Sequence, residues 1–148
     1  MRWSRGRLIS LTAGSVSVAG EPQIRCANPA DAAPPGGHYS HAVTAGGFVF
    51  ISGQLPVRPC GTHAPEADFT AQANQALANL FAALAAAGTS RQAIVKVTVY
   101  VTDIADWPVF NALYAQAMGE HRPARTVVPV PVLHHGYRIE IDAIALPC

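Results

Sequence analysis

The segment Pro123-Ala124-Arg125-Thr126 carries the residue best suited to chemistry on a small acid. Its arginine lies where a proline-rich connection enters a β-branched run, so a rigid backbone would hold it. A guanidinium is permanently charged and presents a planar fork of donors that matches a carboxylate. Arg125 is therefore a candidate for binding a small carboxylate. A surface or interface ion pair is the alternative that spacing leaves open.

A second candidate is the pair of carboxylates Glu140 and Asp142, which alternate with isoleucines. On a strand both would project from one sheet face, with Arg138 beside them. Two neighbouring carboxylates can raise the pKa of one of them and supply a proton donor or acceptor near neutral pH. The alternative is a solvated polar face with a local salt bridge.

The six histidines do not have the spacing of a metal site. The adjacent His134 and His135 would point to opposite faces of a strand, and the sequence holds no HxH or HExxH motif. We predict that both lie in a turn ending at Gly136 and that the protein binds no metal.

Composition and charge limit the class of protein to which this chain can belong. The 148 residues fit one domain, and none of the apolar runs approaches the roughly 18 residues of a membrane span. A formal charge of +1 with no dense Lys/Arg stripe argues against nucleic acid as a partner. The three cysteines are odd in number and outside any CxxC motif, which favours a reducing compartment, and we predict the cytoplasm.

Hydrophobic residues make up 50% of the chain and charged residues only 13%. So few charged residues cannot easily cover the surface of a folded domain. We therefore expect apolar surface to be buried between identical subunits.

Residues 1–22 contain three arginines and no acid before Glu21, and we predict an N-terminal extension that is disordered or serves in targeting. Residues 23–148 would form the single folded domain.

Periodicity predicts the elements that position the candidate residues. Two short strands, at 42–43 and 48–52, would flank a tight turn at Gly46-Gly47. Apolar residues at spacings of three and four predict an amphipathic helix over 69–87, with its N-cap at Asp68.

The second half of the chain alternates strands with a helix. The period-two pattern of 94–101 predicts a strand with Val95, Val97, Val99 and Val101 on one face. A helix would run from about 106 to 119, followed by an edge or bulged strand at 126–130 and a last strand at 137–145. The fold class is α+β, one sheet with two helices on a single face and neighbouring subunits on the other.

Five ordered blocks between about residues 24 and 146 resemble the reactive intermediate deaminase (Rid, or YjgF) family. The blocks are Gly37-His38-Tyr39-Ser40-His41-Ala42-Val43, Phe50-Ile51-Ser52-Gly53-Gln54-Leu55-Pro56, Ile94-Val95-Lys96-Val97-Thr98-Val99-Tyr100-Val101, Pro123-Ala124-Arg125-Thr126-Val127-Val128 and Ile139-Glu140-Ile141-Asp142-Ala143-Ile144-Ala145. Their order along the chain is far more specific than any one block.

The resemblance implies a chorismate-mutase-like fold assembled as a homotrimer with three clefts between subunits. It implies a 2-iminobutanoate/2-iminopropanoate deaminase-like hydrolase of C–N bonds. Members with the arginine hydrolyse 2-imino acids or their enamine tautomers to 2-keto acids and ammonia without a metal or organic cofactor, and so limit damage by reactive metabolites.

The resemblance also implies roles for individual residues. Arg125 would pair with the substrate carboxylate, while Tyr39 and Glu140 would line the cleft and place substrate and water. Gly53 would offer backbone contacts, and Asn111 would come from the second helix. Orientation, a bound water and a proton path are the main needs of this reaction, because an iminium carbon is already electrophilic.

One residue departs from the family pattern, since many members have a cysteine where this chain has Val127. The missing thiol is compatible with a substrate that is bulkier or more apolar than a simple imino acid. Two other functions use the same Arg125 clamp: a dedicated pathway enzyme, such as a deaminase of an aminomuconate-like acid or a lyase, and a non-catalytic trimer that binds a small carboxylate or a partner protein.

Overall fold

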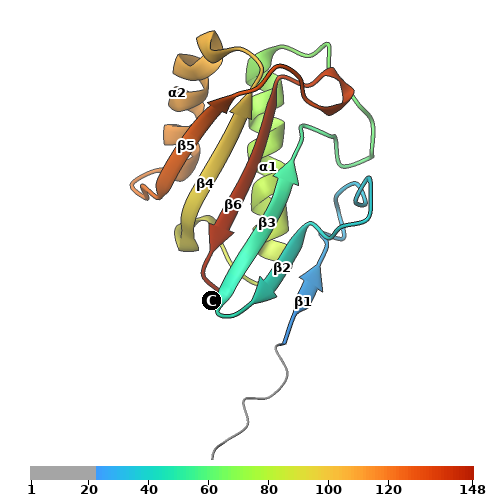
Figure 1. Cartoon of the computed structure of the whole chain (residues 1–148), viewed down its shortest axis with the longest axis vertical. Helices are drawn as coiled ribbons and strands as arrows, with labels where there is room; N and C mark the ends of the chain where they lie inside the picture. Colours follow the sequence, from blue (N-terminus) through green and yellow to red (C-terminus); the bar gives the residue numbers. More distant parts are fainter. Residues whose placement is uncertain (1–22) are drawn as a thin grey trace, which may run out of the picture.

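The computed structural model describes residues 23–148, which form a mixed sheet backed by two helices (Figure 1). The predicted extension, residues 1–22, lies outside the described residues. The main elements are β1 (Arg25–Ala27), β2 (Ala42–Ala45), β3 (Phe48–Gln54), α1 (Phe69–Ala86), β4 (Ile94–Val101), α2 (Trp107–Met118), β5 (Ala124–Pro129) and β6 (Ile139–Ala145). Short 3₁₀ turns η1 (Arg91–Ala93), η2 (Ile104–Asp106) and η3 (His134–Gly136) connect them.

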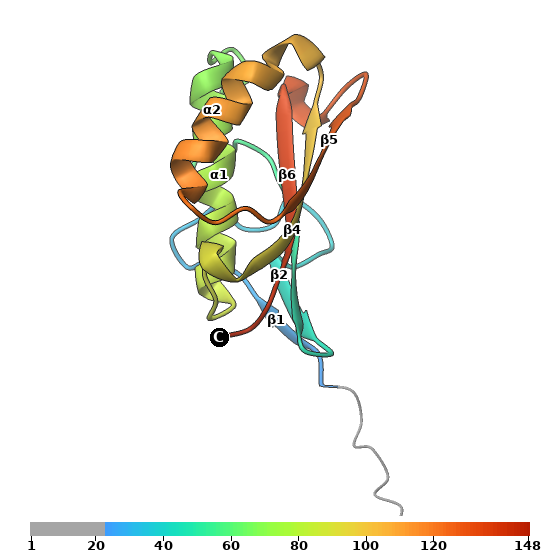
Figure 2. The same ribbon diagram turned by 90° about the vertical axis from the view of Figure 1, so that its left-hand side faces the viewer.

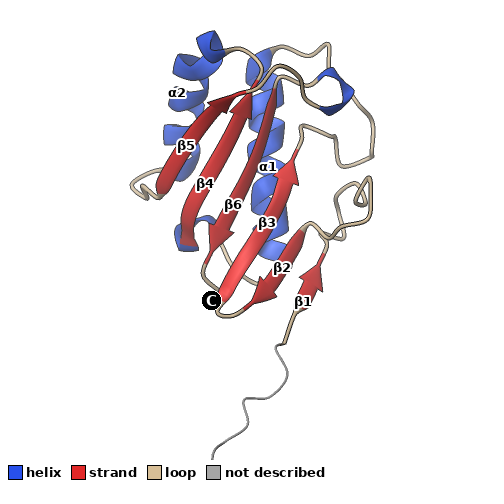
Figure 3. Cartoon of the chain, viewed as in Figure 1, coloured by secondary structure: helices blue, strands red, loops and turns tan. Residues whose placement is uncertain are grey.

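The six strands lie in the order β1-β2-β3-β6-β4-β5 (Figure 3). All neighbours are antiparallel except β4 and β5, which run parallel because α2 forms the crossover between them. Both helices cover the same face of the sheet (Figure 2). The predicted α+β class with two helices on one face is therefore confirmed.

Local signals set the predicted turns and helix ends. Gly46 and Gly47 have φ angles of 57° and 80°, the left-handed backbone that a two-residue hairpin turn requires between β2 and β3. The Asp68 side chain accepts a hydrogen bond from the Ala71 N–H at 2.7 Å and caps α1. The α2 helix ends before Gly119, whose φ is 63°.

Strand β4 has the predicted bounds, but its Val95 side chain does not lie on the predicted face of the sheet. The pairing of β4 with β6 shifts between Ile94 and Lys96, which marks a bulge. Ile94 takes the buried position, and Val95 is 44% exposed. The prediction that Val95 shares the face of Val97 is therefore wrong, because the bulge breaks the alternation on which it depended.

The bounds of the other strands also differ from the predicted ones: β2 ends at Ala45 and not at 43, β5 spans Ala124–Pro129 and not 126–130, and β6 begins at Ile139 and not at 137. The three-residue β1, which pairs with β2, is too short to show a period and was not expected. Strand β3 continues two residues beyond 52, to Gln54. This extension brings Gly53 into the sheet beside β6.

The two faces of the sheet have different surroundings. Side chains such as Val99, Ile139 and Ile141 are completely buried beneath the helices. On the opposite face Phe48 and Phe50 are 42% and 44% exposed. The helix-free face thus carries large apolar side chains in contact with solvent within a single chain.

Candidate functional site

Arg125 lies on β5, the edge strand, and pairs with Val97 of β4. Its side chain therefore projects on the helix-covered face, beneath α2. The Arg125 Nη2 donates a hydrogen bond to Asn111 Oδ1 at 2.8 Å. Its guanidinium carbon lies 4.7 Å from the centre of the Tyr114 ring and 5.8 Å from that of Phe110. Cation–π contacts and one amide thus hold the guanidinium in a single orientation.

The charge of Arg125 is not neutralised within residues 23–148. The ion pair found in this part of the chain joins Arg138 to Asp106, and no carboxylate there lies within ion-pair distance of Arg125. The guanidinium borders a cavity of about 510 Å³ that Asn111, Tyr114, Arg122 and other residues line. A half-buried positive charge beside a cavity is a suitable place for a small anion.

Tyr114 was missed by the sequence analysis. Its hydroxyl is buried with no hydrogen-bond partner among the described residues, and burial raises its pKa while the charge of Arg125 opposes that rise. The available signal was its spacing from Asn111, because residues three apart lie on the same side of a helix.

Glu140 lies on the helix-free face, as does Asp142, and both alternate with buried isoleucines as predicted. The Tyr100 hydroxyl donates to Asp142 Oδ2 at 3.1 Å. Burial raises the pKa of Glu140; the nearby His134 opposes this rise and Asp142 adds to it. Glu140 is therefore protonated at a higher pH than an ordinary glutamate, which suits proton transfer.

Gly53 lies directly against Glu140, at an irregularity where the pairing of β3 with β6 shifts between Ile51 and Gln54. A Cβ atom on residue 53 would come within 2.9 Å of Glu140 Cδ, and closer still to its carboxylate oxygen. The backbone of β3 can approach this carboxylate only because residue 53 has no side chain.

Tyr39 precedes β2 in a loop and is 48% exposed. Its hydroxyl accepts a hydrogen bond from the Gly36 N–H at 3.3 Å, and its ring meets that of His41 edge-on at 6.0 Å. Tyr39 and Gly53 line the same cavity of about 410 Å³. They therefore belong to one region of the surface, with Glu140 adjacent to Gly53.

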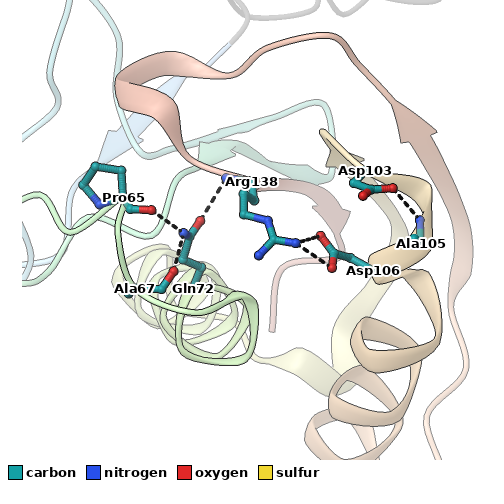
Figure 4. Close-up of polar contacts among 7 residues, drawn as sticks. All are labelled: Pro65, Ala67, Gln72, Asp103, Ala105, Asp106 and Arg138. Carbon is teal, nitrogen blue, oxygen red and sulfur yellow. Dashed lines mark hydrogen bonds and ion pairs between the residues drawn. The ribbon is translucent and has the colours of Figure 1, made fainter.

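Arg138 does not lie beside the two carboxylates, and that prediction is wrong. Its Nη2 donates to both carboxylate oxygens of Asp106, at 2.8 and 2.6 Å, and its guanidinium carbon is 5.3 Å from the centre of the Phe69 ring (Figure 4). The residue precedes β6, so the alternation of the strand does not reach it. Its role is to join the start of β6 to the start of α2.

The six candidate residues form two separate half-sites. The arginine half-site consists of Arg125, Asn111 and Val127, where Val127 pairs with Val99 and packs against the core. The glutamate half-site consists of Glu140, Gly53 and Tyr39. Strand β4 lies between β5 and β6, and the two half-sites use opposite faces of the sheet. One chain alone therefore does not bring all six residues together.

Within residues 23–148, no three His, Cys, Asp or Glu side chains cluster closely enough to hold a metal ion. None of the helices described is long and apolar enough to cross a membrane. The three cysteines are unpaired and exposed. His134 and His135 lie in the η3 turn, as predicted.

Comparison with known proteins agrees with the fold and with the ordered blocks. The family model described as endoribonuclease L-PSP matches residues 30–147. A RutC family protein of Pyrococcus horikoshii is 44% identical over 115 residues, which cover 78% of this chain and 91% of that protein. The 2-iminobutanoate/2-iminopropanoate deaminase of Escherichia coli is 42% identical over 113 residues, covering 74% of this chain and 88% of that one.

A solved structure shares the same architecture. The crystal structure of Escherichia coli TdcF with bound serine superimposes with a TM-score of 0.78 at 37% sequence identity, covering 84% of this chain and 99% of that one. The matched family model spans most of the chain, and the fold follows that of solved relatives. The chain therefore belongs to the Rid/YjgF family, the family whose model is described as endoribonuclease L-PSP.

Proposed function

We propose that this protein hydrolyses reactive 2-imino acids and their enamine tautomers to 2-keto acids and ammonia. The observation that carries this proposal is Arg125, a half-buried guanidinium that Asn111 and Tyr114 orient and no carboxylate neutralises among the described residues. Such a group is suited to holding the carboxylate of a 2-imino acid. The name of the Escherichia coli relative and the serine bound to TdcF, a small amino acid, support a ligand of this class.

In the proposed reaction, the oxygen of a water molecule adds to the iminium carbon to form a carbinolamine. Glu140 accepts the proton that this water loses and returns it to the nitrogen. The carbon–nitrogen bond then breaks, the hydroxyl proton passes to the departing ammonia, and the 2-keto acid and ammonium leave. No electrons are exchanged, so the reaction needs no oxidant or reductant.

The same proposal includes a homotrimer in which the active site lies between subunits. The arginine half-site of one subunit would face the glutamate half-site of the next, with Tyr39 and Gly53 contacting the substrate. The separation of the two half-sites within one chain supports this arrangement, as do the exposed Phe48 and Phe50. The folded domain would span residues 23–148 and act in the cytoplasm on reactive intermediates.

The test is to generate 2-iminopropanoate in situ and follow its decay with wild-type protein and with Arg125→Ala. We expect wild type to accelerate decay and Arg125→Ala to lower kcat/KM by about 10- to 100-fold, the loss of a hydrogen bond between charged groups. Arg91→Ala, which removes an exposed guanidinium on η1, is the matched control and should behave as wild type.

Each outcome separates the functions that the sequence leaves open. If wild type does not accelerate decay but still binds pyruvate through Arg125, the protein is a carboxylate-binding module and not a general deaminase. If Arg125→Ala is as active as wild type, the role assigned to this arginine is wrong.

A further inference from the structure

The cavity of about 410 Å³ beside the glutamate half-site has features that hydrolysis alone does not explain. Residues of loops 32–41 and 55–63, the η3 turn, the end of β3 and Asn79 of α1 line it. Tyr39 and Gly53 line it and also belong to the glutamate half-site. A substrate whose reacting carbon lies beside Glu140 could therefore extend its side chain into this cavity.

Two aromatic pairs contribute to the walls of the cavity. The rings of His63 and His135 lie 4.1 Å apart, centre to centre, at an angle of 34°. Tyr39 and His41 form an edge-on pair with centres 6.0 Å apart. Aromatic faces and edges at these spacings are favourable surfaces for another ring.

The position of the histidine pair is held by contacts from beneath. The Tyr137 hydroxyl, on a side chain that is only 1% exposed, hydrogen bonds to His63 Nδ1 at 3.2 Å and accepts from the Ala64 N–H at 3.3 Å. His135 has a φ of 59°, the one left-handed backbone conformation of a residue other than glycine among residues 23–148. A conformation of this kind persists only where the surrounding structure imposes it. The buried Tyr137 and the η3 turn thus fix the position of the pair at the exposed side of the cavity.

The remaining lining is apolar or uncharged. Leu55, Val57 and two prolines contribute to it, and no aspartate, glutamate, lysine or arginine is among the described residues that line it. The methyl group of 2-iminopropanoate would leave most of this volume empty. A planar aromatic ring would fill more of it and contact the aromatic walls.

We propose that this cavity binds the aromatic side chain of the substrate and that the preferred substrates are aromatic 2-imino acids. The inference rests on the proposed function for the position of the reacting carbon. The apolar Val127 in the arginine half-site is consistent with a substrate of this kind.

Binding of the product acids tests the cavity without requiring catalysis. Isothermal titration calorimetry of the full chain should give a Kd for phenylpyruvate at least about tenfold below that for pyruvate. His135→Gly should lower this selectivity by about three- to tenfold, the range of one aromatic contact. Glycine accepts the left-handed backbone, so the turn is kept. His63→Ala should lower it similarly, and His38→Ala, an exposed histidine outside the cavity lining, should leave it unchanged.

Kinetics with imines made in situ from L-phenylalanine and L-alanine complete the test. A higher kcat/KM for the aromatic imine, reduced in both cavity variants, supports the proposal. Equal binding of the two keto acids, or selectivity that neither variant changes, overturns it even if both imines are hydrolysed. If phenylpyruvate binds selectively but neither imine is hydrolysed faster than in buffer, the proposed hydrolysis fails and the aromatic cavity stands.

Discussion

At the residue scale, the two charged groups of the candidate site differ in how their surroundings affect them. Arg125 keeps its charge in any environment, and its neighbours only orient it. Glu140 can gain or lose a proton, and partial burial beside Gly53 moves its pKa upward. One group is thus suited to permanent binding and the other to proton transfer.

Replacing Gly53 with alanine should damage the glutamate half-site. The new Cβ would overlap the Glu140 carboxylate, so either the carboxylate or the β3 backbone must move. We expect a loss of stability of about 1–3 kcal/mol, measured by urea unfolding, and a fall in kcat/KM. Gly36→Ala is the control for stability, because a Cβ there meets nothing within 4 Å. Wild-type stability and activity in Gly53→Ala would contradict the close packing described.

The raised pKa of Glu140 predicts a pH dependence of stability. Between the ordinary glutamate pKa of 4.5 and the raised value, folded Glu140 holds its proton while unfolded Glu140 has lost it. Its contribution to stability is therefore present at low pH and is lost as pH rises through the folded-state pKa. Relative to Glu140→Gln, the free energy of unfolding of wild type should fall as pH rises through this window.

Urea titrations from about pH 4 to about pH 8 measure this difference. Glu66→Gln removes an exposed carboxylate and provides the comparison. A wild-type minus Glu140→Gln difference that stays constant over the whole range would show that the Glu140 pKa is not raised by folding.

At the element scale, one buried amide connects three segments around the start of α1 (Figure 4). The Gln72 Nε2 donates to the carbonyl oxygens of Pro65 and Ala67, and its Oε1 accepts from the Arg138 N–H. Arg138 in turn reaches Asp106 at the start of α2. This network joins the loop before α1, both helices and β6, and so positions the strand that carries Glu140.

Gln72→Leu should therefore destabilise the fold more than the small change in side-chain shape would by itself. Leucine fills a similar space but leaves three backbone groups without their partner, and we expect a loss of about 3 kcal/mol, measured by urea unfolding. Asn74→Leu makes the same chemical change on the exposed side of α1 and should cost little. Equal stabilities of these two variants would mean that the three hydrogen bonds contribute little.

At the scale of the whole molecule, the helix-free face of the sheet leaves large apolar side chains exposed to solvent. Phe48 and Phe50 lie 6.3 Å apart, centre to centre, and both are exposed in the single chain. Neighbouring subunits are the proposed cover, and the same contact would unite the two half-sites. Assembly and activity would then be lost together.

Phe50→Glu tests this coupling. Light scattering should give wild type a mass of three times the 15.5 kDa chain and the variant the mass of a smaller species. Because burying an unpaired carboxylate is costly, the variant should also lose imine hydrolysis while its circular dichroism remains that of a folded protein. Ala78→Glu places the same charge on the exposed side of α1 and should remain trimeric. A wild-type monomer with full activity would contradict the site between subunits.

The sequence by itself determined the features that depend on near neighbours. The Asp68 cap, the Gly46-Gly47 turn and the bounds of β4 follow from side chains within a few residues, and all were predicted correctly. The residue types at Arg125 and Glu140 likewise limited the chemistry. Side-chain periodicity and turn preference are local properties, so a single sequence displays them directly.

Only the tertiary structure decided which side chains meet. The bulge at Val95, the ion pair of Arg138 with Asp106 and the tilted contact of His63 with His135 all depend on how strands and loops pack. Register likewise placed Arg125 and Glu140 on opposite faces of the sheet, because Arg125 pairs with the buried Val97 and Glu140 pairs with Tyr100. Such contacts depend on register, and a one-residue shift in register moves a side chain to the other face.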